Sequence, residues 1–199
     1  MDKQMATQIN SEFQKYVMEL RAFKLPKFSD FTDVGLYMDQ VVGLMEKYLK
    51  IMKRADEKQF ITPSMINNYV KMGVMPPPWQ KRYAPVHLAY LVMICLLKQV
   101  LTINEIKLLL DFKEEDIEKE YDRFCRLFEK SVDGSEIKMT NDCMELALFS
   151  LTGKIYAQKL IDLKSAAIKE RRKQEEEEKA KKAEEEKQKK AEEAKHKEK

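Results

Sequence analysis

The order of structural elements is clearest in residues 62–110, which have the sequence TPSMINNYVKMGVMPPPWQKRYAPVHLAYLVMICLLKQVLTINEIKLLL. A short helix is predicted first, because Thr62 can accept a hydrogen bond from an unpaired N–H group of the first turn and Pro63 suits the first helical position. Gly73 is typical of the left-handed residue that ends a helix. A basic turn, an apolar helix and a capped helix are predicted to follow.

The first predicted helix has a polar face that carries amides and a cation but no acid. Its members recur at i, i+3, i+4 and i+7 and therefore share one side of the helix; they are Ser64, Asn67, Asn68 and Lys71. Asparagine can make two hydrogen bonds to adenine, lysine can reach guanine or phosphate, and a helix fits the major groove. We therefore expect this face to contact double-stranded DNA. The alternative is a short polar surface without a partner.

A proline-rich basic turn follows this helix. Pro76, Pro77 and Pro78 prevent helix and keep the chain extended. Two cations then lie between two aromatic residues, in the order Trp79, Gln80, Lys81, Arg82 and Tyr83. Such a turn can place its cations on DNA phosphates. The spacing is equally compatible with Trp79, the only tryptophan, packing in the core while the cations have no role.

The order of helix, glycine, proline-rich turn and apolar helix resembles the MerR-type winged helix-turn-helix. This resemblance implies DNA contacts by Tyr69 and Lys71 in a recognition helix and by Arg82 and Tyr83 in a wing. The sequence departs from the MerR pattern at three positions, where an arginine, an aromatic residue and an acid are usual: Asn67, Asn68 and Val70.

A second resemblance covers the chain from Leu25 to about Leu110. The strings LYMDQVV (36–42), TPSMINNYVK (62–71) and KRYAPVHLAYL (81–91) are similar to a bacterial family catalogued as a domain of unknown function, DUF 1836. That resemblance implies a likeness to MerR-like DNA-binding regulators.

The composition of the 199 residues predicts an all-α protein with one core domain. Hydrophobic residues make up 44% of the chain, which is enough for a core, and only five glycines interrupt long helical periodicities. The net charge of +3 does not by itself indicate nucleic-acid binding. Residues 60–111, however, contain two acids against five cations, which are Lys71, Lys81, Arg82, Lys98 and Lys107.

Further helices are expected on both sides of this region. Apolar periodicity and caps predict helices at 9–23, 34–52, 86–100, from 103 after a Thr102–Glu105 capping box, at 117–130 and from 141, with a turn at 132–135. In a helix-turn-helix the helix at 34–52 would support the recognition helix. The connection between them, residues 53–62, is longer than the usual turn of such a motif.

Four segments are predicted: an N-terminal helix (1–24), a winged helix-turn-helix-like domain (25–112), a C-terminal helical region (113–170) and a Lys- and Glu-rich tail (171–199). An apolar stripe at 144–167 can pack on its own domain or on a second copy, so a homodimer is one of two expectations. The tail has no apolar heptad positions, so it is expected to be a solvated helix or disordered rather than a stable coiled coil by itself.

Neither metal, cofactor nor catalytic chemistry is expected. The cysteines Cys95, Cys125 and Cys143 are far apart and form no CxxC pair, which favours buried free thiols in a reducing cytoplasm. His87 has no nearby carboxylate or serine partner, so a structural or surface position is expected for it. We find no nucleophile, base and acid at workable spacing and no Gly-rich phosphate loop. The N-terminus has no apolar core of signal-peptide length, and the most apolar stretch, residues 86–97, is too short to span a bilayer, which predicts a cytoplasmic protein.

The function predicted from the sequence is therefore DNA binding, in a transcriptional regulator that reads the major groove. The alternative is a winged-helix module that binds another protein through Trp79 and the three prolines. The helices after Lys113 could also enclose an effector, whose identity the sequence does not indicate.

Overall fold

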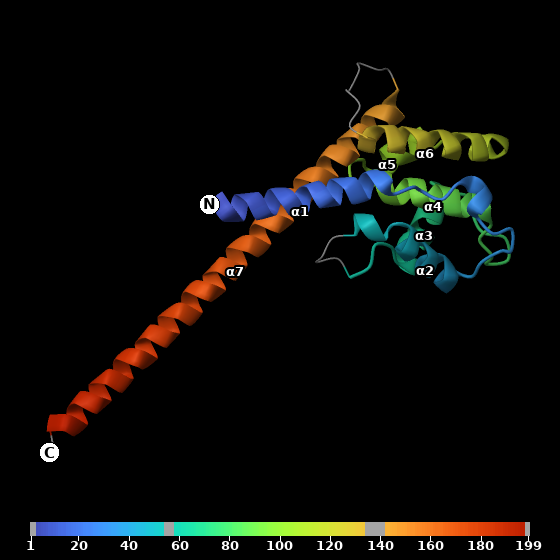
Figure 1. The fold of residues 1–199 in the computed structure, drawn as a ribbon. Coiled ribbons are helices and arrows are strands. Elements are labelled where there is room, and N and C mark those ends of the chain that lie inside the picture. Colours follow the sequence, from blue (N-terminus) through green and yellow to red (C-terminus); the bar gives the residue numbers. More distant parts are fainter. Residues whose placement is uncertain (1–2, 54–57, 134–141, 198–199) are drawn as a thin grey trace. The chain divides into compact units, whose positions relative to one another are not determined.

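The computed structural model describes residues 3–53, 58–133 and 142–197 (Figure 1). Within these ranges the regular secondary structure is helical and includes no β-strand beyond isolated bridges, which confirms the all-α prediction. Residues 16–156 form one compact unit, called here the main unit, and residues 1–15 with 157–199 form a second one, the terminal unit. The region with the polar helix and the proline-rich turn lies in the main unit.

Helix α4 (Pro85–Leu97) is the centre of the main unit. Every residue from His87 to Leu97 is buried, as expected for a helix that is apolar on all sides. It packs against α6 (Ile117–Asp133) and α2 (Met38–Tyr48). The helix ends at Leu97, three residues before the predicted end, and a hydrogen-bonded turn follows it.

Helix α2 begins later than the sequence predicts. Residues 34–37 are not helical, because Leu36 N donates to Tyr83 O and Tyr83 N donates to Leu36 O, each over 2.9 Å. This antiparallel bridge keeps the backbone extended before Met38. A 3-10 turn, Lys50–Met52, follows the helix. The predicted helix over 34–52 is therefore wrong at its N-terminal end, where a partner distant in sequence pairs with the chain.

The long connection between α2 and α3 (Pro63–Lys71) is held on the main unit at both ends. The Glu46 carboxylate accepts hydrogen bonds from Lys53 Nζ at 2.9 Å, from Phe60 N and from Ile61 N at 3.4 Å. Lys98 Nζ donates to Phe60 O at 3.0 Å. Partial burial alone would raise the pKa of Glu46, but these hydrogen bonds lower it below its usual value. Glu46 thus stabilises the connection as a carboxylate.

The predicted caps at the two ends of α3 (Pro63–Lys71) are confirmed. Thr62 Oγ1 accepts from Met65 N at 3.3 Å at the N-terminus. Gly73 has φ +65° at the C-terminus, and Val74 N donates to Tyr69 O at 2.9 Å, which is the hydrogen bond of a Schellman cap.

Helix α5 (Ile103–Leu109) begins with the predicted capping box. Glu105 N donates to Thr102 Oγ1 at 3.4 Å, and Thr102 N donates to the Glu105 carboxylate at 2.7 Å. Lys107 Nζ then donates to Met72 O at 2.9 Å and so covers a carbonyl at the end of α3.

The loop between α1 (Lys3–Ala22) and α2 packs on α6. It contains the 3-10 turn Phe28–Asp30. Tyr121 Oη donates to Pro26 O at 2.8 Å, and the rings of Phe31 and Tyr121 lie 5.4 Å apart. A second 3-10 turn, Glu114–Asp116, leads into α6.

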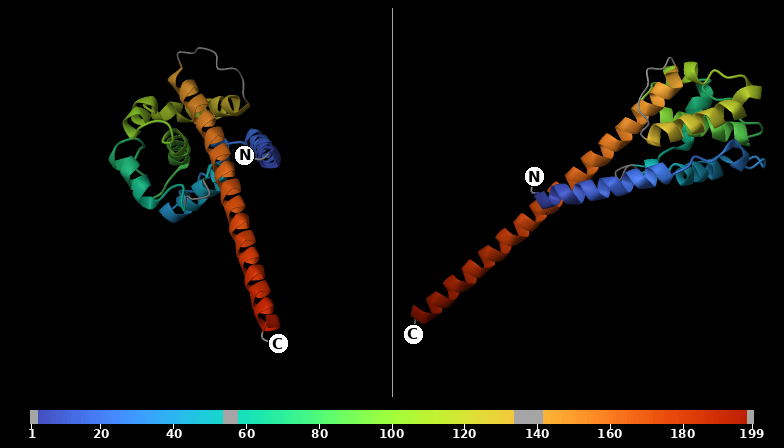
Figure 2. Two further views of the ribbon diagram at one scale, coloured as in Figure 1. Left: turned by 90° about the vertical axis from the view of Figure 1, so that its left-hand side faces the viewer. Right: turned by 45° about the horizontal axis from the view of Figure 1, so that its top comes forward.

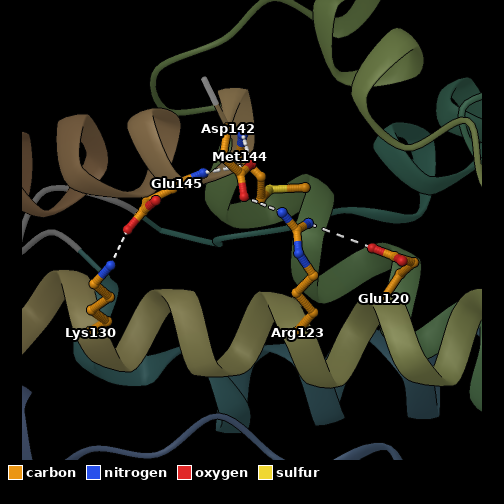
Figure 3. Close-up of polar contacts among 6 residues, drawn as sticks. All are labelled: Glu120, Arg123, Lys130, Asp142, Met144 and Glu145. Carbon is orange, nitrogen blue, oxygen red and sulfur yellow. Dashed lines mark hydrogen bonds and ion pairs between the residues drawn. The ribbon is translucent and has the colours of Figure 1, made fainter. Parts of the chain in front are cut away.

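Ion pairs join α6 to the start of α7 (Cys143–Lys197) on either side of residues 134–141 (Figure 3). The Asp142 carboxylate caps α7 by accepting from Met144 N at 3.0 Å and from Glu145 N at 3.3 Å. Arg123 of α6 pairs with Asp142, and Lys130 pairs with Glu145. Helix α6 continues through Val132 and Asp133, so the predicted turn at 132–135 is wrong at these two residues. The other turn residues, Gly134 and Ser135, and the predicted helix start at Asn141 lie outside the described residues.

The first half of the apolar stripe at 144–167 packs on its own domain. These side chains belong to the core of the main unit: Met144, Leu148, Leu151 and Ile155. Intramolecular packing, one of the two expectations for this stripe, therefore applies to this half, and these residues do not offer a surface to a second copy. The predicted boundary at residue 112 also does not separate two cores, since α4 and α6 share one.

The terminal unit consists of the beginning of α1 (Lys3–Ala22) and the continuation of α7, which is one uninterrupted helix, orange to red in Figure 2. Ile9 and Leu163 line a groove of about 390 Å³ between the two helices. Ile161 and Ile168 are 58% and 47% exposed. The charged tail, expected to be helical or disordered, is helical as far as Lys197. Arg171 and Glu175 form an ion pair in it at 3.1 Å.

Two of the three cysteines are buried, as expected, and one is not. Cys95 and Cys125 are buried, and burial raises the pKa of the Cys125 thiol to about 12. Cys143 is exposed, so the expectation of a buried thiol is wrong there. Within the described ranges we find no cluster of side chains that could hold a metal ion. The described helices also include none whose length and apolar character would let it cross a bilayer.

We predict that Glu46→Gln lowers the free energy of unfolding by about 1–3 kcal/mol at neutral pH, because hydrogen bonds to a charged group are lost or weakened. The folded protein holds the pKa of Glu46 below its unfolded value. The deficit should therefore be full above about pH 4.5 and should shrink as pH falls through the folded pKa. Urea unfolding at several pH values measures it.

Glu19→Gln is the matched control for this prediction, because Glu19 is exposed on α1. It should change stability by less than about 0.5 kcal/mol. A Glu46→Gln deficit that stays constant down to acidic pH would contradict the proposed role of the carboxylate.

Candidate nucleic-acid interface

Helix α3 has an apolar face that faces the core and a polar face that faces solvent. Ile66 and Tyr69 are buried, at 0% and 5% exposure. The four members of the predicted DNA-reading face are all exposed, namely Ser64, Asn67, Asn68 and Lys71. Asn68 Nδ2 lies 3.3 Å from Met72 Sδ, a weak acceptor that leaves the amide oxygen open. The helical spacing in the sequence therefore identified the exposed face correctly.

Two tyrosines that the MerR resemblance places in a DNA interface are instead core residues. Tyr69 and Tyr83 are 5% and 3% exposed, and burial raises the pKa of both phenols. Their rings cannot contact DNA in this conformation, so we remove them from the candidate interface. For Tyr69 the signal was in the sequence, because it follows Ile66 by three residues and so shares its apolar face.

The proline-rich turn closes as a two-residue hairpin at Trp79–Arg82, called here the hairpin turn. Arg82 N donates to Trp79 O at 2.7 Å, and the two residues form an antiparallel bridge. Gln80 and Lys81 between them have φ +47° and +60°. Both are exposed at the tip. Two successive left-handed residues are typical of a type I′ turn, where Asn-Gly is preferred. Non-glycine residues there carry backbone strain.

Arg82 is tied to the segment that precedes α2. Its Nη1 donates to Gly35 O at 3.0 Å, and its guanidinium carbon lies 4.0 Å from the centre of the Tyr37 ring. A Cβ on Gly35 would lie 2.8 Å from Arg82 Cβ, so glycine is required for this approach. The side chain remains exposed, and a guanidinium has five N–H donors. Arg82 therefore has both a structural role and donors for an external acceptor.

Trp79 is a surface residue. Its side chain is 79% exposed, so the alternative in which it packs in the core is wrong. The aromatic residue at the other end of this stretch, Tyr83, is the one that packs in the core.

His87 is buried and holds the proline run on α4, which agrees with the expected structural role. Its Nδ1 accepts from Ala84 N at 2.9 Å, so the neutral ring carries its hydrogen on Nε2. That nitrogen lies 3.3 Å from Pro77 O and can donate to it. The imidazole thus links the start of α4 to the residues before the hairpin turn.

The polar face of α3 and the hairpin turn share an open groove of about 470 Å³. Asn67 lines it from α3, Lys81 from the hairpin turn and Tyr37 and Asp39 from the start of α2. No sequence pattern points to Tyr37 and Asp39 as members of this groove, because their position depends on how α2 packs against α3. Asp39 is an acceptor suited to the amino group of cytosine and is unfavourable next to a phosphate.

The five cations of residues 60–111 do not all belong to this surface. Lys98 and Lys107 donate to backbone carbonyls of Phe60 and Met72. The remaining three are exposed around the groove or on the same helix face: Lys71, Lys81 and Arg82. Lys98 and Lys107 therefore stabilise the fold, Lys71 and Lys81 can meet an anion, and Arg82 can do both.

A second groove of about 620 Å³ runs between the end of α3, the prolines and α5. Pro76, Tyr90, Leu108 and Phe112 are among the residues that line it. The sequence leaves open an effector pocket in the helices after Lys113, whereas all the residues that line this groove precede Lys113. We assign no ligand to it.

A protein-family model described as "Domain of unknown function (DUF1836)" matches residues 26–131, which is more than half of the chain. The match extends beyond the predicted range of resemblance and includes most of α6. No curated protein and no solved structure matches the chain.

We predict that Gln80→Asn with Lys81→Gly raises the free energy of unfolding by about 1–2 kcal/mol, because Asn-Gly relieves the strain of two left-handed residues. Thermal or urea unfolding measures the change. Lys81→Ala removes the same charge but keeps a Cβ at φ +60°, so this control should not stabilise the protein. Equal stability of the double variant and the wild type would contradict a strained turn.

Proposed function

The chain belongs to the DUF1836 family, whose description names no activity, and we propose that it is a DNA-binding protein that acts as a transcriptional regulator. The observation that carries this proposal is the exposed face of α3, which has amides and a lysine but no acid, and of which Asn67 lines one groove together with Lys81. In this proposal α3 enters the major groove, and Asn67 and Asn68 contact base edges. A regulator of this kind acts in the cytoplasm.

The proposed architecture is a MerR-like winged helix-turn-helix with an expanded connection. Helix α2 packs on α3 as a supporting helix would, and the hairpin turn has the position of a wing. The ends of the long connection are fastened by Glu46 and Lys98, which allows it to replace a tight turn. These contacts support the proposal by giving α3 a rigid base.

Phosphate contacts are assigned to the cations beside the reading face. Lys81 is exposed at the tip of the hairpin turn, and Lys71 is exposed in the last turn of α3. Arg82 can add a further donor while its Nη1 holds Gly35 O. Phosphate contacts set the position of the helix in the groove, whereas the asparagines specify sequence.

A selection of binding sites tests the proposal directly. The full-length protein is incubated with random double-stranded DNA at moderate salt, and bound fragments are sequenced over several rounds. We expect one motif to be enriched. A pool that remains random, together with no retention of duplex DNA in a gel, would refute the function.

The first prediction for this function concerns base reading. Asn67→Ala and Asn68→Ala should each cost roughly 1–3 kcal/mol of discrimination at a defined base pair, because a bidentate contact is lost. Both side chains are exposed, so the melting temperature should hardly change. Asn104→Ala, an exposed asparagine on α5, is the matched control and should leave the selected motif unchanged. An unaltered motif for the Asn67 and Asn68 double variant would remove them from the interface.

The second prediction concerns phosphate contacts. Lys81→Ala should weaken binding to all sequences alike and should make the slope of log K against log salt shallower by roughly 0.9. Lys119→Ala, which removes an exposed cation of α6, should not alter this slope. Arg82→Ala is less suitable, because it also removes the contacts with Gly35 and Tyr37. An unchanged slope for Lys81→Ala would exclude the phosphate role.

A homodimer remains part of the proposal, but we now place its contact surface further along α7, beyond the part of the apolar stripe that is buried in the main unit. One recognition helix contacts few bases, and a two-fold pair doubles the site. Of the stripe at 144–167, the members up to Ile155 are buried in the main unit. Ile161 and the neighbouring Ile168 are exposed seven residues apart, which is the spacing of one coiled-coil seam.

We predict that Ile161→Glu with Ile168→Glu converts a dimer to a folded monomer, as measured by light scattering of the full chain at micromolar concentration. Half-sites in the selected DNA should then lie about 34 Å apart or at a multiple of that distance. Leu148→Glu is the contrasting variant, because a charge at a fully buried position should unfold the main unit instead. A monomeric wild type that binds one undivided site would refute the dimer.

A second candidate function is protein binding, and it is favoured by the exposure of Trp79. Val34 and Tyr37, on the segment that Arg82 contacts, are also exposed, at 70% and 49%. Tryptophan, tyrosine and arginine are the residue types enriched in interface hot spots. A protein partner captured by the wild type but not by a variant with Trp79→Ala, together with no binding of DNA, would favour this function.

A further inference from the structure

Trp79 is an exposed aromatic side chain on a constrained segment of backbone. At 79% exposure it is among the most exposed large apolar residues of the described chain. Three prolines precede it. The carbonyl oxygen of the second, Pro77, lies 3.3 Å from Nε2 of the buried His87, within hydrogen-bond reach. The carbonyl of Trp79 itself accepts from Arg82 N at 2.7 Å. The indole is therefore presented to solvent by a backbone that is fixed on both sides.

The backbone that presents the indole carries strain. Gln80 and Lys81 both have positive φ, and neither is glycine. Strain of this kind persists where the surroundings enforce it and is concentrated at functional sites. Here the surroundings are the Leu36–Tyr83 bridge and the Arg82–Gly35 hydrogen bond, which close the base of the turn.

Trp79 stands beside cations. Residues that face each other in an antiparallel bridge project to the same side, so Trp79 and Arg82 share one side of the hairpin turn. Arg82 also lies 4.0 Å from the centre of the half-exposed Tyr37 ring. Lys81 follows in the tip and lines the groove that contains Asn67. An exposed aromatic ring next to two cations and an acid-free helix face suits a polyanion that has flat, apolar parts.

We propose that Trp79 is a DNA contact, whose indole packs on the deoxyribose and base edge of the duplex beside the groove that α3 enters. Lys81 and Arg82 hold the adjacent phosphates. This inference rests on the proposed DNA-binding function and assigns to it a residue outside the reading helix. An indole on the sugar and base edge buries apolar surface without hydrogen-bonding to a base, so Trp79 supplies affinity and α3 supplies specificity.

The single tryptophan allows a test on the unaltered protein, because all indole fluorescence comes from position 79. A fluorescently labelled duplex of the selected sequence is titrated with the full chain, and anisotropy of the label follows binding. Quenching of the tryptophan by acrylamide is measured in parallel with an unlabelled duplex. We expect the indole to be readily quenched in the free protein and to be protected several-fold when the duplex is bound.

The two readouts separate the outcomes. Binding by anisotropy with an unprotected indole would overturn the contact of Trp79 and leave the DNA-binding function intact. No binding by anisotropy, with any duplex from the selection, would overturn both. Protection that appears only with single-stranded DNA of the same sequence would overturn the contact with duplex.

Variants give an independent measurement. Trp79→Ala should weaken duplex binding by roughly 5- to 100-fold without changing the selected motif, and Trp79→Phe should recover most of the loss. Leu108→Ala, which shortens an apolar side chain that is 81% exposed on α5, is the matched control and should bind like the wild type. Circular dichroism checks that each variant is folded. Wild-type affinity of a folded Trp79→Ala variant would overturn the proposal.

Discussion

The main unit depends on the burial of one helix that has no polar side. Helix α4 is buried from His87 to Leu97, and a helix of this kind is stable in water only when other elements cover it on every side. Helices α2 and α6 pack against it directly, and the core also includes apolar residues of α3, α5 and the first turns of α7. Each of these helices therefore contributes apolar side chains to the one core that surrounds α4.

This constraint also determines which surface is left for a partner. Helix α3 commits Ile66 and Tyr69 to the core, so its amides and Lys71 must face outward. Two of the local cations are used to cover backbone carbonyls, which concentrates the remaining charge near the hairpin turn. The candidate interface is thus the part of the α2–α3 pair that the core does not use. Two backbone hydrogen bonds between Leu36 and Tyr83 tie the segment before α2 to the residue that follows the hairpin turn.

In the hairpin turn, unfavourable backbone conformations are held in place by contacts at the base of the turn. Its left-handed residues are costly, and its tryptophan is exposed to water, yet its base is fastened by a bridge, an arginine and a histidine. A structure that only needed to connect α3 with α4 could use Asn-Gly and a small polar residue at these positions. Local strain next to an exposed aromatic residue is the combination expected where a side chain is held ready for a partner.

The sequence by itself determined the features that depend on residues within one or two turns of each other. The caps at Thr62, Gly73 and Thr102, the apolar character of α4 and the outward face of α3 are of this kind, because hydrogen bonds and side-chain spacing in a helix are local. Only the tertiary structure decided the exposure of Trp79, the late start of α2 at its bridge with Tyr83 and the burial of Leu148 within its own domain. It also decided that Asp39 joins Asn67 and Lys81 in one groove. Each of these outcomes depends on contacts between residues far apart in the chain, and no local pattern in the sequence specifies which distant surfaces will meet.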